Sequence, residues 1–122
     1  MPPCQNGRMP NPVVHFEIGC KDQAASTQFY SSLFGWTAQQ MGPAAMIQTG
    51  SQQGIQGHIT QLGHEPFKYT IFYVQVDSIE DALAKAESLG GKTVVPKVDI
   101  PMGSFAWISD PDGNTVGLWK NA

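Results

Sequence analysis

Alternating apolar and polar positions begin at Val13. Residues 13–20 read VVHFEIGC, and side chains in a strand point alternately to opposite faces. The pattern therefore predicts a strand with its apolar side chains on one face and His15 and Glu17 on the other. We expect the apolar face to be core, with Cys20 as a small buried hydrophobe, and the polar face to carry chemistry.

A helical pattern follows this strand. Ala25, Phe29 and Leu33 recur at every fourth position, Asp22 is a suitable N-cap, and Gly35 follows the last apolar residues. These features predict an amphipathic helix over residues 23–34 whose apolar stripe contains those three side chains.

The rest of the chain alternates between short strands and one more helix. Gln, Gly and Ser dominate residues 39–61, which favours two or three modest strands joined by tight turns. Residues 69–76 predict a clear strand. A second helix is then expected from Ser78, its N-cap, to Gly90-Gly91, with a buried stripe of Ile79, Leu83, Ala86 and Leu89. Strands are predicted at residues 92–95, 105–109 and 115–119, the first ending at Pro96.

An internal repeat relates the two halves of the chain. An offset of 56 residues, taken from Ile71 and His15, also pairs Leu33 with Leu89 and Gly35 with Gly91. Strand, helix and strands thus occur twice, in modules of about residues 13–61 and 69–119. Each sheet would have one face covered by its helix and one bare, so the space between the modules is the natural pocket.

Composition and charge narrow the class of protein. Seven Lys and Arg against ten Asp and Glu give a formal net charge of −3, which offers no basic stripe for nucleic acid or an anionic membrane. No stretch has the roughly 18 apolar residues of a spanning helix. Four prolines mark residues 1–12 as a flexible tail without a secretion signal, so a cytoplasmic location is expected.

Three stretches resemble the vicinal oxygen chelate superfamily, which includes glyoxalase, the bleomycin resistance proteins and the extradiol dioxygenases. They are VVHFEI with the later FYSSLFGW, then YVQVDSIEDALAKAESLGGK, and FAWISDPDGNTVGLWK at the end. The resemblance covers residues 13–120 as one domain. It implies an α+β fold of two tandem βαβββ modules, which form curled sheets around a shared cavity, often in a homodimer.

The resemblance also implies where a metal ion would bind. Family members that use a metal take one ligand from each of four strands, two per module. His15 matches the first ligand position and His58 the second, but the positions in the second module are Ile71 and Gly117, which lack donors. Glu17 could serve as a third ligand beside the two histidines. A site of His15, His58 and Glu17 for Zn, Ni, Fe or Mn is one expectation, and hydrogen bonding of His15 to Glu17 or to a ligand is the other.

Aromatic residues are expected to line the other side of the cavity. Tyr73 shares a strand face with Ile71, and Trp107 alternates with its neighbours in the same way. If Gly117 faces the cavity, so do Thr115 and Trp119. Tyr73, Trp107, Thr115 and Trp119 would then bind a small planar or aromatic molecule with one or two polar groups. The alternative is that these side chains fill the space completely.

Three functions are compatible with this sequence. A metal-dependent lyase, isomerase or dioxygenase would act on vicinal oxygens, with Glu17 moving a proton. A metal-free pocket would bind a small metabolite or drug-like compound, as bleomycin resistance proteins do. A metal-free enzyme would use His15 and Glu17 as acid and base. The missing donors at Ile71 and Gly117 favour binding or metal-independent chemistry, and leave open whether the protein is an enzyme.

Overall fold

The computed structural model describes residues 10–122, so most of the proposed tail of residues 1–12 lies outside the described part. Two helices and eight strands form between residues 10 and 122, in the order β1 (Val13–Gly19), α1 (Gln23–Phe34), β2 (Thr37–Met41), β3 (Ala44–Gln48), β4 (Gln56–Thr60), β5 (Tyr69–Gln75), α2 (Ile79–Ser88), β6 (Lys92–Ile100), β7 (Gly103–Ser109) and β8 (Thr115–Asn121). The order βαβββ therefore occurs twice, which confirms the α+β class and the two tandem modules.

The repeat offset predicted from the sequence is visible in the strand bounds. Adding 56 to Val13–Gly19 gives residues 69–75, which are the bounds of β5. The helices also correspond, since α1 begins at Gln23 and α2 at Ile79, 56 positions later. Asp22 and Ser78 cap these helices as expected, each accepting a hydrogen bond from a backbone N–H in the first turn.

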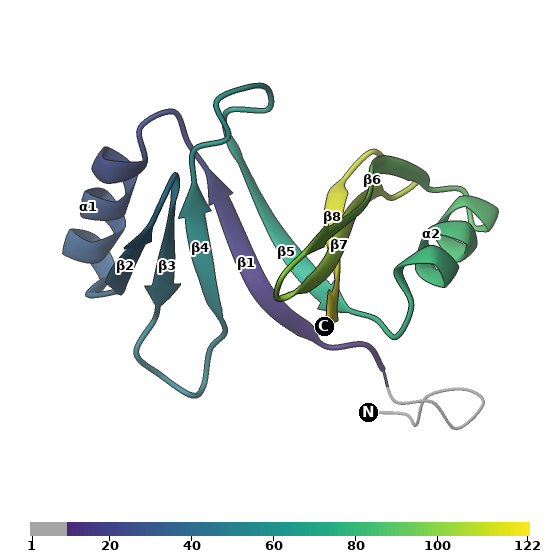
Figure 1. Ribbon diagram of the computed structural model, residues 1–122, viewed down its shortest axis with the longest axis horizontal. Coiled ribbons are helices and arrows are strands. Elements are labelled where there is room, and N and C mark those ends of the chain that lie inside the picture. Colours follow the sequence, from purple (N-terminus) through teal and green to yellow (C-terminus); the bar gives the residue numbers. More distant parts are fainter. Residues whose placement is uncertain (1–9) are drawn as a thin grey trace. The chain divides into compact units, whose positions relative to one another are not determined.

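Residues 14–73 form one compact unit. Its strands lie in the order β2-β3-β4-β1-β5, with β1 parallel to β4 and the β2, β3 and β4 neighbours antiparallel. Helix α1 covers one face of this sheet (Figure 1). The core under the helix contains Cys20, Ala45, Ile47 and Ile59, with Phe16 and Ile18 packed against them. The apolar face predicted for the first strand is thus core, and Cys20 is buried with a free thiol.

The stripe predicted for α1 is wrong. Phe29 and Leu33 are each 59% exposed, and the helix instead turns Gln23 and Tyr30 inward. The Gln23 amide exchanges hydrogen bonds with the Gln40 amide on β2, and the Tyr30 ring stacks on Trp36 with 5.6 Å between centroids. These contacts fix the rotation of the helix.

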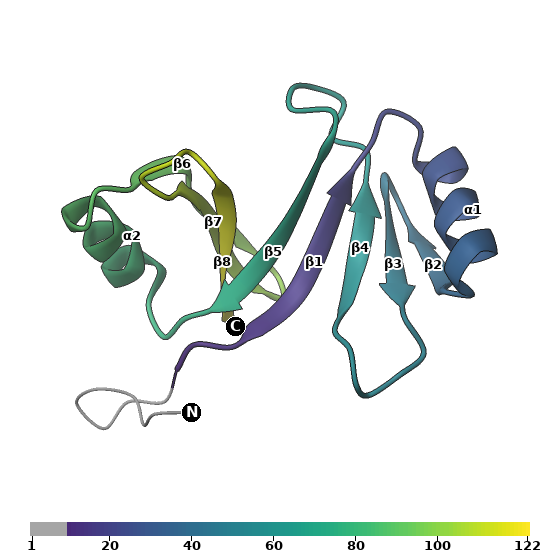
Figure 2. The same cartoon turned by 180° about the vertical axis from the view of Figure 1, so that it is seen from behind.

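The other unit contains residues 74–122 together with residues 10–13. Strands β8, β7 and β6 are neighbours in that order and antiparallel, and α2 packs on them (Figure 2). Its core contains Val76, Ile79, Ala106 and Leu118. The residue that follows β5 bonds to this sheet, because the N–H of Val76 donates to the carbonyl oxygen of Trp119 over 2.8 Å.

Two expectations for this unit need correction. Leu89 is 69% exposed, because it follows the last helical residue, Ser88, instead of lying on the buried stripe. Pro96 does not end its strand: β6 continues to Ile100, with register shifts on both sides of Val95. A proline is tolerated there because β6 is paired on one side only within its unit and the ladder is already interrupted. Neither helix between residues 10 and 122 is long and apolar enough to cross a membrane.

Candidate functional site

Polar side chains meet on the uncovered face of the sheet in residues 14–73. Directly paired residues of neighbouring strands point to the same face, and Glu17 on β1 pairs with His58 on β4. His15 precedes Glu17 by two positions and so shares that face. The structure thus brings together the three residues that the sequence singled out from the first module.

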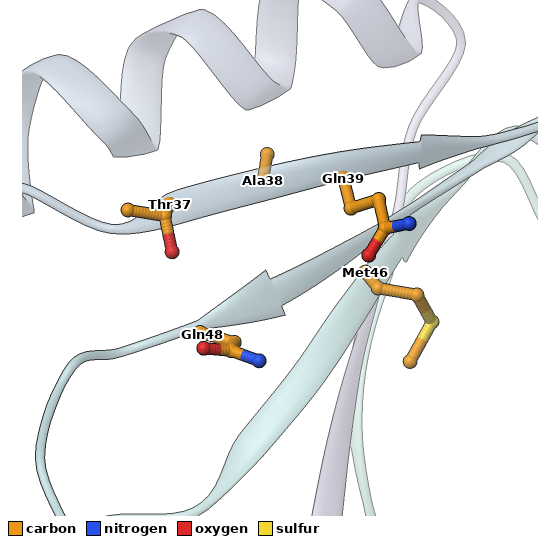
Figure 3. Close-up of a pocket in the computed structure, with 5 residues that line it drawn as sticks. All are labelled: Thr37, Ala38, Gln39, Met46 and Gln48. Atoms are coloured by element: carbon orange, nitrogen blue, oxygen red, sulfur yellow. The ribbon is translucent and has the colours of Figure 1, made fainter.

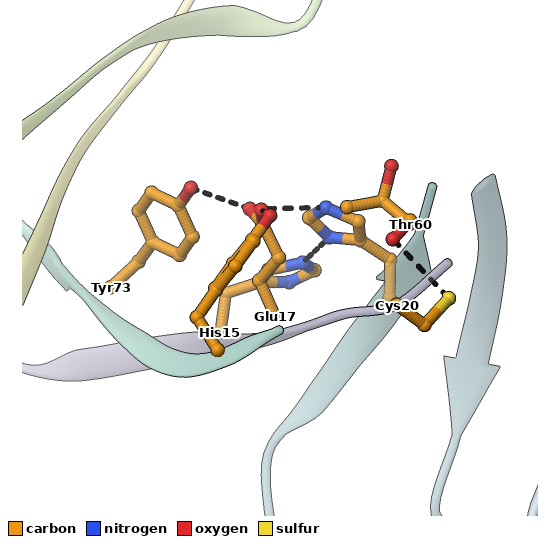
Figure 4. A network of polar contacts seen from close by, with 7 residues as sticks. His15, Glu17, Cys20, Thr60 and Tyr73 are labelled. Atoms are coloured by element: carbon orange, nitrogen blue, oxygen red, sulfur yellow. Dashed lines mark hydrogen bonds and ion pairs between the residues drawn. The ribbon is translucent and has the colours of Figure 1, made fainter. Parts of the chain in front are cut away.

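A chain of hydrogen bonds connects these residues (Figure 4). The Nε2 atom of His15 lies 2.7 Å from Nδ1 of His58. On the other side of the same ring, Nε2 of His58 lies 3.2 Å from Oε1 of Glu17. His58 is therefore the middle member, with one ring nitrogen directed at His15 and the other at the carboxylate.

Two tyrosines from β5 hold the carboxylate in place. The Tyr73 hydroxyl donates to Oε1 of Glu17 over 2.6 Å, and the Tyr69 hydroxyl donates to Oε2. The alternation along this strand predicts Tyr73 on this face, and Tyr69 is an additional member of the site. The same period-two alternation that placed Tyr73 relative to Ile71 also places Tyr69, two positions before Ile71, so the signal was present in the sequence.

Glu17 is buried yet ionised. Only 5% of its surface is exposed, and burial alone would raise the pKa of its carboxyl group. The hydrogen bond and charge of His58, with the two tyrosine hydroxyls, outweigh burial and leave the pKa of Glu17 below its ordinary value. The same arrangement raises the pKa of the Tyr69 hydroxyl, first through burial and then through the bonded carboxylate, so Tyr69 stays a donor.

His15 is neutral at pH 7. Burial, followed by the positive charge that His58 can carry, lowers the pKa of His15 from 6.5 to about 4, and Glu17 opposes this only in part. The two imidazole rings lie with 4.9 Å between centroids. A positive charge on His58 at that spacing opposes protonation of His15.

The partners determine where the protons lie in the neutral state. An ionised carboxylate only accepts hydrogen bonds, so His58 carries its proton on Nε2, which faces Glu17. Its Nδ1 atom then has the lone pair and accepts the bond from Nε2–H of His15. As a result, the lone pair of His15 is on Nδ1, to which no residue between 10 and 122 donates a hydrogen bond.

The donor atoms of His58 and Glu17 take part in hydrogen bonds within the protein. A histidine ligand must direct a lone pair at the ion, whereas both ring nitrogens of His58 face protein groups and both oxygens of Glu17 accept hydrogen bonds. Within residues 10–122, no group of three or more His, Cys, Asp or Glu side chains is placed to hold an ion. The site of His15, His58 and Glu17 for Zn, Ni, Fe or Mn stays a prediction, and we derive no step from it.

Gly19 makes room for Tyr69. A Cβ atom at Gly19 would overlap the Tyr69 ring. We expect Gly19→Ala to push this ring off Glu17 and to lower the free energy of unfolding by about 1–3 kcal/mol, as overpacking does, measured by urea denaturation.

Gly54→Ala is the matched control, because a Cβ atom there would only touch Thr49 Oγ1 at 3.7 Å. In a protein that already carries Tyr69→Ala, Gly19→Ala should lower the free energy of unfolding by much less. An equal cost in both backgrounds would show that the Tyr69 ring is not the reason for the glycine.

Of the four residues predicted for the other side of the pocket, Tyr73 lies beside Glu17 in the unit of residues 14–73, and the remaining three belong to the other unit. Trp107 pairs with Gly117, and Ser109 with Thr115, on β7 and β8. Trp119 pairs with Phe105 in the same register, so all these side chains share the face opposite the core under α2. Their alternation is as expected. Their role in binding a ligand stays a prediction.

Several known proteins are similar to this chain in sequence or in fold. The sequence model of the Glyoxalase/Bleomycin resistance protein/Dioxygenase superfamily matches residues 13–118. The chain is 29% identical to the anthracycline biosynthesis protein DauV of Streptomyces sp. (strain C5), over 86% of this chain and 45% of DauV. It therefore spans less than half the length of this relative.

Two solved structures illustrate the shared fold. Methylmalonyl-CoA epimerase from Mycobacterium tuberculosis superposes with a TM-score of 0.65 at 12% identity, over 90% of this chain and 87% of the epimerase. A glyoxalase/bleomycin resistance protein/dioxygenase superfamily member from Vibrio splendidus 12B01 superposes with a TM-score of 0.62 at 16% identity, over 91% of this chain and 99% of the other. At such identities the likeness shows the fold alone.

Proposed function

The chain belongs to the Glyoxalase/Bleomycin resistance protein/Dioxygenase superfamily, and we propose that it binds a small planar, oxygen-bearing molecule and removes a proton from it without a metal ion. The observation that carries this proposal is the hydrogen-bond chain from His15 through His58 to Glu17. A buried carboxylate with three donors behind two histidines is an arrangement for moving protons.

The proton would move along this chain in two linked transfers. The Nδ1 atom of His15 takes a proton from the carbon next to a carbonyl group, and the electron pair of the broken C–H bond moves onto the carbonyl oxygen. His15 passes its Nε2 proton to Nδ1 of His58. The positive charge then lies on His58, beside the Glu17 carboxylate, where it is stabilised. Without this second transfer His15 would be a weak base, because its own pKa is lowered to about 4.

Two observations support a planar, oxygen-bearing molecule as the ligand. Tyr73 packs edge-on to His15 with 6.0 Å between ring centroids, so an aromatic wall borders the base. The relative DauV is named for anthracycline biosynthesis, and anthracyclines are planar, oxygen-bearing molecules. We extend to this chain only the chemical class, because it covers 45% of DauV.

Deuterium exchange into 2-tetralone tests the proposal. This probe is uncharged and planar in its aromatic half, and its most acidic C–H lies between the ring and the carbonyl group. In D₂O at neutral pH with EDTA, we expect the protein to accelerate loss of that ¹H NMR signal. His15→Gln should reduce the acceleration about 100-fold, the smaller end of the range for removal of a general base.

The exposed loop histidine provides the matched control. His64→Gln also removes one histidine but leaves the hydrogen-bond chain intact, so its exchange rate should equal that of the unmodified protein. Binding of 2-tetralone without faster exchange would contradict proton abstraction and identify a binding protein. Acceleration that appears only when Zn²⁺ or Ni²⁺ replaces EDTA would favour the metal-dependent lyase, isomerase or dioxygenase instead.

A further inference from the structure

A second group of polar side chains lies in the same unit, on β2 and β3. They line a pocket of about 210 Å³ formed by Thr37, Ala38, Gln39, Met46 and Gln48 (Figure 3). Ala38 points toward the helix side in this view, so it contributes backbone, while the other four side chains form the wall. None of the five is charged.

Strand pairing places this pocket beside the hydrogen-bond chain. Gln39 pairs with Met46, and Met46 pairs in turn with His58. Paired residues share a face, so the pocket opens on the same face of the sheet as His58 and Met46 is the residue between them. Two strand spacings, about 10 Å, separate Gln39 from His58.

The two pocket glutamines differ from their neighbours in their hydrogen bonding. The amide of Gln40 bonds Gln23 and the carbonyl oxygen of Gly42, and the amide of Gln56 bonds Thr49 and the carbonyl oxygen of Ser51. In contrast, the amides of Gln39 and Gln48 bond no residue in the described range 10–122. They offer both a donor and an acceptor to a ligand.

We propose that this pocket binds the uncharged, hydroxyl- or carbonyl-bearing end of the substrate while the reacting carbon lies at His15. The inference rests on the proposed function and names its substrate class: an elongated molecule with a neutral polar group at least about 10 Å from the acidic C–H, because β1 with His15 lies one strand beyond β4. Because whole ligands usually occupy about 300–1,000 Å³, the pocket suits one ring of such a molecule. A carboxylate or phosphate finds no positive partner among its five lining residues.

Three matched probes test this inference: 6-phenyl-2-tetralone and its two derivatives with a hydroxyl group or a carboxylate at the para carbon of the phenyl ring, which place the polar group roughly two strand spacings from the acidic carbon. We expect the hydroxyl group to lower the Kd about tenfold, as one or two new hydrogen bonds do, and the carboxylate to give no gain. The side-chain amide signals of Gln39 and Gln48 and the methyl signal of Met46 should shift in ¹⁵N and ¹³C correlation spectra when the hydroxylated probe is added.

Substitutions then locate the effect. The double variant Gln39→Leu/Gln48→Leu should bind 6-phenyl-2-tetralone and its hydroxylated form equally well, whereas a variant at an exposed glutamine outside the pocket, Gln52→Leu, should keep the tenfold difference. A hydroxyl gain that survives the double variant, or absent shifts at both glutamines, would overturn the subsite. Exchange into plain 2-tetralone reports on the proposed function separately, because it does not depend on the hydroxyl group.

Discussion

Replacing Glu17 by alanine is expected to lower the free energy of unfolding by about 3–5 kcal/mol. The change removes the acceptor of three hydrogen bonds, those from Tyr69, Tyr73 and His58. Each donor left unsatisfied in a buried site costs about 1–3 kcal/mol, and the sum is reduced by water that enters the space. Urea denaturation at pH 7 measures the loss.

Glu87→Ala is the matched control for this prediction. Glu87 also accepts a hydroxyl hydrogen bond, from Thr93 over 2.7 Å, but at the exposed surface. Its loss should cost less than about 1 kcal/mol. Replacing both tyrosines by phenylalanine should recover part of the cost of Glu17→Ala, because two of the three donors are then absent. A Glu17→Ala protein within about 0.5 kcal/mol of the unmodified one would contradict the buried network.

Stability is expected to fall by about 2–3 kcal/mol as the pH decreases from 6.5 to 4. The folded-state pKa of His15 is about 4 against an ordinary value of 6.5. Between these values the unfolded chain binds a proton at His15 that the folded chain does not, so acid favours unfolding. The full shift corresponds to somewhat more than 3 kcal/mol, and partial solvent exposure of the ring reduces it.

Glu17 adds to this loss at lower pH. Its folded pKa is below the ordinary 4.5, so its contribution is present above that pH and disappears as the pH falls through the folded value. Denaturation curves at pH 7, 6, 5 and 4 and constant ionic strength separate the two groups. His15→Gln, which keeps a donor for His58 but does not titrate, should flatten the profile above pH 4.5, and His64→Gln should not. An unchanged profile for His15→Gln would show that another group is responsible.

The sequence predicts the architecture well because the architecture depends on repeated local patterns. Alternation in residues 13–20 separates the core face from the polar face, and the offset of 56 residues reproduces the bounds of β5 from those of β1. Caps at Asp22 and Ser78 and the left-handed glycine after α1 set the helix ends. These features need no knowledge of tertiary contacts.

The errors occur where tertiary contacts choose between equivalent local options. The large apolar residues of helix α1 form a broad face that includes Tyr30 as well as Phe29 and Leu33, so the four-residue spacing of Phe29 and Leu33 does not by itself decide which side is buried. Contacts of Gln23 with Gln40 and of Tyr30 with Trp36 decide the rotation. Pro96 remains inside β6 because the register shifts locally. The local sequence around a residue does not determine which distant residue it contacts or in which register its strand pairs.

The site is predicted in its members but not in its connections. His15 and His58 come from the family resemblance, and Glu17 and Tyr73 come from the alternation of side chains along their strands. The sequence does not show which side-chain nitrogen and oxygen atoms of these residues face each other. The order His15, His58, Glu17 along one hydrogen-bond chain, with Tyr69 and Tyr73 on the carboxylate, supports the metal-independent chemistry that the sequence already favours.

A scalar coupling across the hydrogen bond between His15 and His58 tests this account most directly. In chelator-treated, ¹⁵N-labelled protein at pH 7, we predict a measurable ¹⁵N–¹⁵N coupling between Nε2 of His15 and Nδ1 of His58, because these atoms share one proton over 2.7 Å. One equivalent of Zn²⁺ should leave it unchanged. Absence of the coupling, together with a stoichiometric shift of both rings on adding Zn²⁺, would show that the residues ligate a metal and would contradict the relay.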